Sequence, residues 1–276
     1  MTLAVFKTLW GCSSDIRGGI EQALEAGFTG VEGPVPIDAP DFFRELGDTP
    51  WIAEVSTCTP SGEYLPLPHR TVVEHLASLE AGLLRCIPGG PLFVTSMAGS
   101  DSWGLDDCLR FYEGVLGLQE KHGTVISVET HRGRPTWNPW MTERFVVAFP
   151  ELRLTCDFSH WCVVTERLVL DQEPILLEKI ASHAHHIHGR VGYAQGPQVP
   201  DPRAPEYEAE LKGHERWWDV LFASMRQRGM ARATFTPEFG PDGYLQCRPF
   251  TLEPVADLWE INRWIGHRQM TRHSLL

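Results

Sequence analysis

The sequence predicts one α/β domain over residues 1–276, folded as a closed (β/α)8 barrel whose active site lies at the C-terminal ends of the strands. Three observations predict this fold. Short β-rich runs alternate with amphipathic helical stretches along the whole chain, in eight successive units. A length of 276 residues with 42% apolar content suits one large core. Polar residues of the kinds that bind metals also follow four consecutive β-rich runs.

The expected strands are runs rich in β-branched and aromatic residues, and they lie at 3–10, 29–32, 51–57, 91–97, 125–131, 152–160, 184–190 and 233–239. The first helix is expected to begin at the capping residue Asp15 and to close at Gly27. The other helices are expected at 41–46, 72–84, 105–121, 142–149, 165–180, 215–228 and 252–268. The long Pro-rich segment 192–213 is typical of a lid or a binding loop.

Composition narrows the class of protein. A formal net charge of -12 argues against a nucleic-acid surface and against an anionic membrane surface, because both require clustered Lys and Arg. The N-terminus shows no secretory pattern, so a cytoplasmic protein is expected. The seven scattered cysteines are expected to be reduced. Motifs for nucleotide hydrolysis, Rossmann redox chemistry and serine hydrolysis are absent from the sequence.

Four strand ends in the second half of the chain each carry one hard metal ligand: Glu129, Asp157, His188 and Glu238. In a barrel, the C-terminal ends of all strands surround one mouth, so these four side chains are expected to meet. Three carboxylates and one imidazole suit Mn²⁺ or Mg²⁺ better than a thiolate-type zinc site. Buried together without a cation, the carboxylates would repel one another, which is a physical reason to expect an ion. His186 shares a strand face with His188 and is the alternative ligand.

The ordered motifs Val-Glu-Thr-His, Cys-Asp-Phe-Ser-His, His-Ile-His-Gly-Arg and Thr-Pro-Glu-Phe-Gly resemble the xylose isomerase-like TIM-barrel superfamily of sugar phosphate isomerases and epimerases. The resemblance implies one divalent ion, with Mn²⁺ expected first and Mg²⁺, Co²⁺ or Zn²⁺ as alternatives, held by Glu129, Asp157, His188 and Glu238. It also implies that Glu129 and Glu238 exchange protons with the substrate as catalytic residues, and that His160 is a substrate contact.

The reaction implied is proton transfer next to a carbonyl of a sugar or related polyhydroxy compound, through a metal-stabilised enediolate. This hypothesis makes the protein an isomerase or epimerase with a small-molecule partner. A dehydratase acting on a keto-sugar, inosose or cyclic hydroxy acid is the alternative, and a non-catalytic sugar-binding barrel is a third. The related barrel-type apurinic endonucleases need extra histidines on the third and fourth strands, where this chain has none.

Several further residues are candidate substrate contacts. Arg190 follows His188 where the family commonly has an acidic residue, and it suits a carboxylate, a phosphate or a polarised oxygen, or else a pairing with acidic neighbours. The remaining candidates are the imidazoles of His131 and His186 and two aromatic rings that could stack on a sugar, those of Trp103 and Trp137.

Glu32 and Glu54 on earlier strands are expected to contact substrate or to support Lys7. His183 and His185 are expected behind the barrel wall, and His214 on the exposed surface. Barrels of this family often assemble, so a homo-oligomer is an open expectation.

Overall fold

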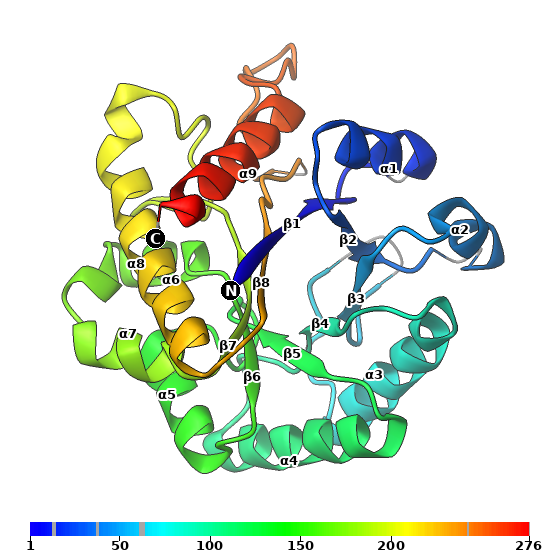
Figure 1. Ribbon diagram of the computed structural model, residues 1–276. Coiled ribbons are helices and arrows are strands. Elements are labelled where there is room, and N and C mark those ends of the chain that lie inside the picture. Colours follow the sequence, from blue (N-terminus) through cyan, green and yellow to red (C-terminus); the bar gives the residue numbers. More distant parts are fainter. Residues whose placement is uncertain (13–14, 37–38, 61–63, 242, 276) are drawn as a thin grey trace.

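The computed structural model describes residues 1–12, 15–36, 39–60, 64–241 and 243–275, and it shows a closed barrel of parallel strands surrounded by helices (Figure 1). The strands follow one another around the barrel in chain order, and the last pairs with the first. Their bounds are β1 Thr2–Thr8, β2 Gly30–Pro34, β3 Trp51–Ser56, β4 Val94–Met97, β5 Ile126–Glu129, β6 Arg153–Cys156, β7 Ala184–His188 and β8 Arg232–Thr236. The predicted (β/α)8 barrel is confirmed.

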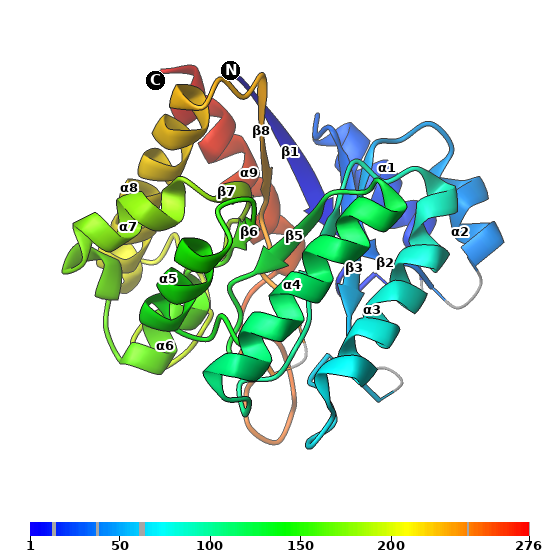
Figure 2. The same cartoon turned by 90° about the horizontal axis from the view of Figure 1, so that it is seen from below.

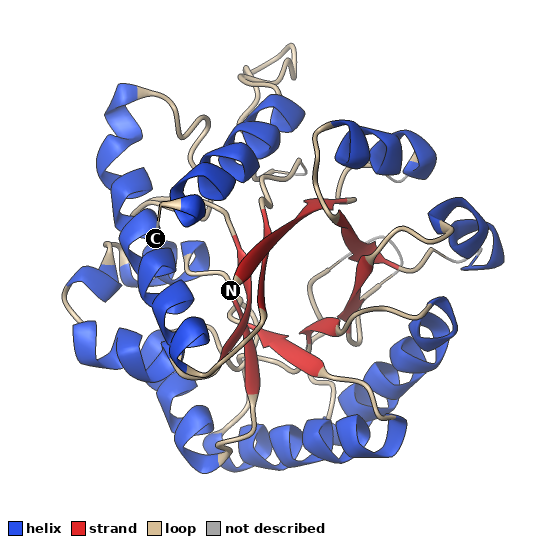
Figure 3. Cartoon of the chain, in the orientation of Figure 1, coloured by secondary structure: helices blue, strands red, loops and turns tan. Residues whose placement is uncertain are grey.

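The helices form the outer ring (Figure 3). Their bounds are α1 Ile16–Glu25, α2 Ala39–Leu46, α3 Val72–Cys86, α4 Leu105–His122, α5 Pro139–Ala148, α6 Ser159–Thr165, α7 Pro174–Ala181, α8 Glu208–Gln227 and α9 Leu258–Ser274, with short 3-10 turns at Ile87–Gly89, Val169–Asp171 and Pro205–Tyr207. No helix in the described part of the chain combines the length and the apolar character that crossing a membrane requires.

Local sequence chemistry sets several of these helix starts. The Asp15 carboxylate accepts a hydrogen bond from the Gly18 N–H, as expected for the capping residue of α1. Thr71 and Glu74 form a reciprocal capping box at the start of α3, which satisfies two backbone donors that the helix itself leaves free. A cap of this kind contributes about 1 kcal/mol to helix stability.

Alternate side chains along the strands pack into two different apolar clusters. On β1, Val5 belongs to the large core between the barrel and the helices, whereas Ala4 and Phe6 belong to a small apolar cluster with Ile52 and Phe93. Because successive side chains point to opposite faces of a strand, this small cluster fills the inside of the barrel near the strand starts. The barrel interior beyond it, toward the strand ends, is polar.

The helices after the sixth and seventh strands differ from the prediction. The helix expected at 165–180 starts only at Pro174, as α7. The preceding helix α6 begins at Ser159 and ends at Thr165, because the next residue, Glu166, has a left-handed backbone (φ 54°). Helix α8 begins seven residues earlier than the expected 215, so the long loop is shorter. Helix α9 begins at Leu258 rather than at 252, because Asp257 caps it through the Glu260 N–H.

Strand β7 contains an irregularity that the sequence pattern did not reveal. Leu154 pairs with Ala184 but the next residue, Thr155, pairs with His186, so His185 is an extra residue. Ala184 therefore joins the outer core, although it lies two residues before His186, which points into the barrel. The expectation that His185 lies behind the wall is wrong, because its ring packs edge-on against Phe93 of the inner cluster at 4.5 Å.

His214 is fully buried, which corrects the expectation of a surface histidine. It lies on α8, where its Nδ1 is 2.9 Å from the Glu210 carbonyl oxygen and its Nε2 accepts from the Gly192 N–H at 3.3 Å. Those two partners define a neutral ring with the proton on Nδ1. Burial lowers the pKa of His214 to about 4.

The buried neutral ring makes stability depend on pH. The unfolded chain binds a proton at His214 below about pH 6.5 and the folded chain only near pH 4, so this stability is present above pH 6.5 and is lost as pH falls toward 4. Between pH 7 and pH 5 the loss should be about 2 kcal/mol. Urea unfolding at pH 7 and pH 5 gives the change in the free energy of unfolding between the two pH values. This change should be smaller in His214→Gln than in the wild-type protein by about 2 kcal/mol. Equal pH dependence in both proteins would contradict the assignment.

Candidate active site

The structure brings together the four side chains expected to bind the metal. Glu129 ends β5, Asp157 directly follows β6, His188 ends β7 and Glu238 lies two residues beyond β8. One potential ligand atom from each lies within 4.8 Å of all the others, and all four residues are buried. Viewed from the side, the termini lie at one end of the barrel and the segment after β8 extends at the other (Figure 2). The site is therefore at the predicted end of the barrel.

Several polar atoms of this cluster lie close together without a hydrogen-bond partner of good geometry in the described part of the chain. His188 Nδ1 lies 3.0 Å from Glu238 Oε2 and 3.6 Å from Glu129 Oε1. Within the described residues, His188 Nδ1, Glu238 Oε2 and Glu129 Oε2 are buried and make no hydrogen bond of good geometry. Convergent buried oxygen and imidazole nitrogen atoms that lack donors fit a divalent cation, which would satisfy all of them.

Asp157 is held firmly in place. Its Oδ1 accepts hydrogen bonds from the Ser159 N–H at 2.9 Å and the Ser159 hydroxyl at 2.5 Å. Its Oδ2 accepts from Arg190, whose guanidinium also lies 3.3 Å from Glu238 Oε2 and 2.8 Å from His160 Nε2. Arg190, which the sequence marks as a candidate substrate contact, thus pairs with two of the acidic residues.

Burial and neighbouring charges give the two glutamates of the cluster, Glu129 and Glu238, different pKa values. Burial raises the pKa of Glu129 to about 7. Burial acts in the same direction on Glu238, but His188 and Arg190 outweigh it and hold the pKa of that carboxyl below its usual value. Two carboxyls whose environments separate their pKa values in this way suit complementary acid and base roles.

His131 and His160 form the neighbouring wall of the site. Their rings lie 4.0 Å apart, and burial holds the pKa of both well below the usual value, so both are neutral. The Nδ1 atoms of both rings are buried and have no hydrogen-bond partner among the described residues. The structure therefore places both predicted substrate contacts beside the acidic cluster.

Aromatic rings that the sequence analysis missed cover this wall. Tyr244, in the segment between β8 and α9, lies 6.3 Å from the His160 ring and 6.1 Å from Tyr64 of the segment after β3. The guanidinium of Arg190 lies 4.8 Å from the Tyr244 ring, and that of Arg132 lies 5.0 Å from it. No sequence pattern marked these tyrosines, because both lie in irregular segments that meet only in the fold.

The other predicted contacts have different surroundings. His186 lies one step deeper in the barrel than His188 and bonds Glu32 and Thr234, so of the two histidines His188 is the one in the acidic cluster. Trp103 packs edge-on against His75 at 4.9 Å and donates to the Arg70 carbonyl oxygen. Trp137 is 37% exposed just before α5. A role for either tryptophan in substrate binding stays a prediction.

Lys7 does not meet either early glutamate, so the expectation that Glu32 or Glu54 supports it is wrong. Its ammonium lies over the Trp259 ring at 5.0 Å and 3.2 Å from Cys12 Sγ. The reason is strand alternation, because Lys7 shares the outer face of β1 with Val5. Glu32 and Glu54 are buried carboxyls on β2 and β3, and Glu32 bonds the histidines of β7.

The loops around the site are fastened by buried polar contacts. The Gln198 side chain donates to the Gly240 carbonyl oxygen at 3.2 Å and accepts from the Gly240 N–H at 2.9 Å, which joins the segments after β7 and β8. The fully buried Arg134 donates to the carbonyl oxygens of Gly99, Thr57 and Tyr64, which joins the segments after β3, β4 and β5.

Comparison with known proteins shows the same fold. No protein-family model and no curated protein matches the chain. Among solved structures, the 3-keto-D-glucoside 4-epimerase YcjR from E. coli matches with a TM-score of 0.60 and 13% identity, covering 96% of this chain and 99% of the other. The probable 3-DHS dehydratase AsbF of Bacillus anthracis, involved in petrobactin synthesis, matches with a TM-score of 0.55 and 13% identity, covering 99% and 100%.

A third barrel, the protein SMc04130 from Sinorhizobium meliloti 1021, matches with a TM-score of 0.54 and 12% identity, covering 99% of this chain and 97% of the other. Matches over whole chains at such low identity show a shared fold. That fold is the one that the resemblance of the four motifs implies.

Arg134 offers a test of how the loops around the site are held. Replacing it with Met keeps much of its volume but leaves three carbonyl oxygens without their donor, so the free energy of unfolding should fall by about 3 kcal/mol. Urea denaturation measures this loss, and the exposed Arg153→Met on β6 is the control. A loss below about 0.5 kcal/mol would mean that these hydrogen bonds do not stabilise the loops.

Proposed function

We propose that this protein is a divalent-metal-dependent isomerase or epimerase that moves a proton next to the carbonyl group of a small polyhydroxy compound. One observation carries the proposal: the free ligand atoms of Glu129, His188 and Glu238 converge with Asp157 at the mouth of the barrel. Four ligands of this kind favour Mn²⁺. The cation would supply Lewis-acid stabilisation of the negative charge that develops on substrate oxygens when a neighbouring C–H proton leaves.

The two glutamates are suited to the proton transfers. Each has a carboxylate oxygen free of hydrogen bonds, and they belong to different strands, so they approach a substrate in the mouth from different directions. One would take the proton from carbon, and the same or the other would return it. Return to the neighbouring carbon is isomerisation, and return to the opposite face of the same carbon is epimerisation.

Asp157 and Arg190 would hold the site in shape during these steps. The Arg190 guanidinium balances the charge of Asp157 and lies beside Glu238, and its position is fixed by the Ser159 hydroxyl at 3.1 Å. A charged pair with satisfied hydrogen bonds is rigid, and rigid dipoles favour charge that develops at a fixed place.

A dehydratase is the second candidate, and one observation favours it. The neutral rings of His131 and His160 stand beside the acidic cluster with free Nδ1 atoms. An imidazole N–H there could donate a hydrogen bond to a leaving hydroxyl, while the glutamate that took the proton from the neighbouring carbon gives it to the leaving oxygen to form water. The fold neighbours include both an epimerase and a dehydratase, so the shared fold is compatible with either reaction.

Deuterium incorporation tests the proposal. Incubated in D₂O with Mn²⁺ and a panel of keto-sugars and inososes, the enzyme should introduce deuterium at a carbon beside the carbonyl of its substrate, detected by NMR and mass spectrometry. A product whose mass differs from that of the substrate only by the label indicates isomerisation or epimerisation. A product lighter than the substrate by about 18 Da, the mass of one water molecule, indicates dehydration. Binding of a compound without any proton exchange would contradict both candidates and indicate a binding protein.

Removing either proton-transfer group should abolish exchange. Glu129→Gln and Glu238→Gln keep the shape of the side chain but cannot accept the proton, so each should lower the exchange rate at least about 100-fold. The matched control is Glu151→Gln, an exposed glutamate before β6 and therefore at the opposite end of the barrel, which should keep the normal rate. Normal exchange in both active-site variants would refute the roles of these glutamates.

A further inference from the structure

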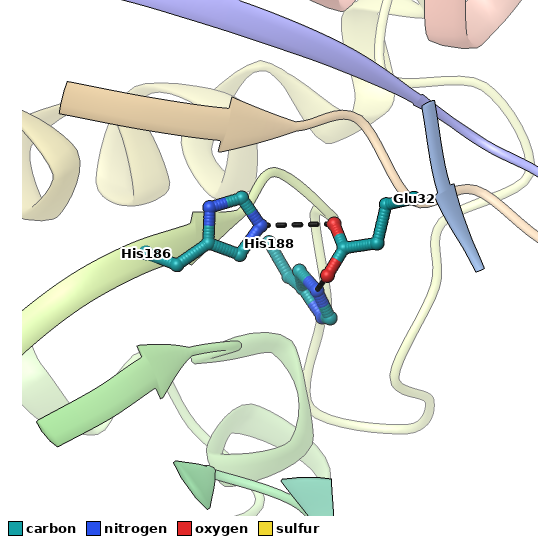
Figure 4. Close-up of side chains that lie close together, drawn as sticks. All are labelled: Glu32, His186 and His188. Carbon is teal, nitrogen blue, oxygen red and sulfur yellow. Dashed lines mark hydrogen bonds and ion pairs between the residues drawn. The ribbon is translucent and has the colours of Figure 1, made fainter. Parts of the chain in front are cut away.

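Glu32 lies in the middle of β2 and reaches across the barrel to two histidines of β7 (Figure 4). Its Oε2 lies 2.9 Å from His186 Nε2, and its Oε1 lies 3.1 Å from His188 Nε2 and 2.8 Å from the Thr95 hydroxyl. All four side chains are fully buried. A carboxylate in such a place requires donors around it, and here it has three.

The proton on each ring follows from these contacts. An ionised carboxylate only accepts hydrogen bonds, so Nε2 of both histidines carries a hydrogen. Three potential donors converge on the two oxygens of Glu32, and hydrogen bonds of this kind favour the charged form of a carboxyl. The second nitrogen of His186 then accepts from the Thr234 hydroxyl, with Nδ1 and Oγ1 2.8 Å apart.

The second nitrogen of His188 faces the site instead. With the hydrogen of Nε2 directed to Glu32, Nδ1 is the atom presented to Glu129 and Glu238. This is the tautomer that a metal ligand needs, because the coordinating nitrogen has to give its lone pair. A carboxylate behind a ligand histidine also orients its ring and makes the coordinating nitrogen more basic.

We propose that Glu32 is a positioning residue for the metal site: by accepting the His188 Nε2 hydrogen, it fixes the tautomer and ring orientation that present Nδ1 to the cation. The inference rests on the proposed function, since it assigns a purpose to a ligand of the same site. It extends the site to a strand on the far side of the barrel, 156 residues earlier in the chain.

A purely structural role would predict something different. If Glu32 served only to link β2 to β7, its bond to His186 would suffice, and the chemistry of His188 would not depend on it. The neighbouring Glu54 shows that a buried carboxyl in this barrel does not have to pair with a histidine, because its Oε1 has no hydrogen-bond partner among the described residues. The pairing of Glu32 with a ligand histidine is therefore specific.

Two variants and two measurements test this inference. Glu32→Gln keeps an acceptor for the His188 hydrogen but removes the charge, and Glu32→Leu removes both. The dissociation constant for Mn²⁺, measured by competition with a chelator, should rise about tenfold in Glu32→Gln and about 100-fold in Glu32→Leu. The control Glu215→Gln neutralises another buried carboxylate, which bonds Arg268 on the outer ring, and should change the constant less than twofold.

The second measurement needs no metal. In the metal-free protein, ¹⁵N-edited NMR should show a slowly exchanging His188 Nε2–H resonance, assigned by its absence from His188→Gln. The resonance should persist in Glu32→Gln and disappear in Glu32→Leu. Glu32→Gln is the variant expected to fold in every case, because it preserves the shape and most of the hydrogen bonds.

The possible outcomes distinguish the positioning role of Glu32 from the proposed metal-dependent function. Unchanged Mn²⁺ affinity in Glu32→Gln and Glu32→Leu would overturn the positioning role and leave the metal site intact. A wild-type protein that shows the resonance but does not bind Mn²⁺, Mg²⁺, Co²⁺ or Zn²⁺ would overturn the proposed function and keep the bond between Glu32 and His188. Absence of the resonance from the wild-type protein would overturn the inference directly.

Discussion

Three carboxylates buried at one end of the barrel are the constraint to which the rest of the structure is fitted. Taking a carboxylate out of water costs several kcal/mol unless positive charge compensates it. The cluster of Glu129, Asp157 and Glu238 has Arg190 on one side and His188 on the other. Burial alone would lower the pKa of His188, but Glu238 and Glu32 raise it well above the usual value. A divalent cation bound there would add positive charge where negative charge is in excess.

The polar interior of the barrel follows from the same constraint. An apolar plug of Ala4, Phe6, Ile52 and Phe93 fills the end where the strands start, and the other end carries the site. Between them, hydroxyl groups connect the strands: Thr155 donates to Ser127 at 2.8 Å, and Thr95 donates to Glu32 at 2.8 Å. The Thr95 hydroxyl helps to hold Glu32 in the interior, and Glu32 in turn bonds His188. The site is thus built from the inside of the barrel as well as from its mouth.

Much of this could be predicted from the sequence, because period and spacing are local signals. The alternation of strands and helices predicted the barrel, and metal-binding side chains at successive strand ends predicted Glu129, Asp157, His188 and Glu238 as one cluster. The bulge at His185 escaped prediction, since a one-residue shift depends on pairing with β6. The partners of Glu32 and the tyrosines over the site also escaped, because contacts between distant segments leave no local pattern. The break between α6 and α7 was not predicted either, although Pro174 is of the residue type that commonly starts a helix.

Metal binding by the purified protein is the most direct test of this account. Metal-free wild-type protein should be titrated with Mn²⁺ by isothermal calorimetry, alongside Asp157→Ala, with elemental analysis of both proteins as purified. The account predicts about one divalent ion per chain in the wild-type protein and at least a 100-fold weaker affinity in the variant, since loss of a charged ligand removes part of the coordination. If neither Mn²⁺ nor Mg²⁺, Co²⁺ or Zn²⁺ binds to the wild-type protein, the four side chains do not form a metal site and the proposed reaction loses its basis.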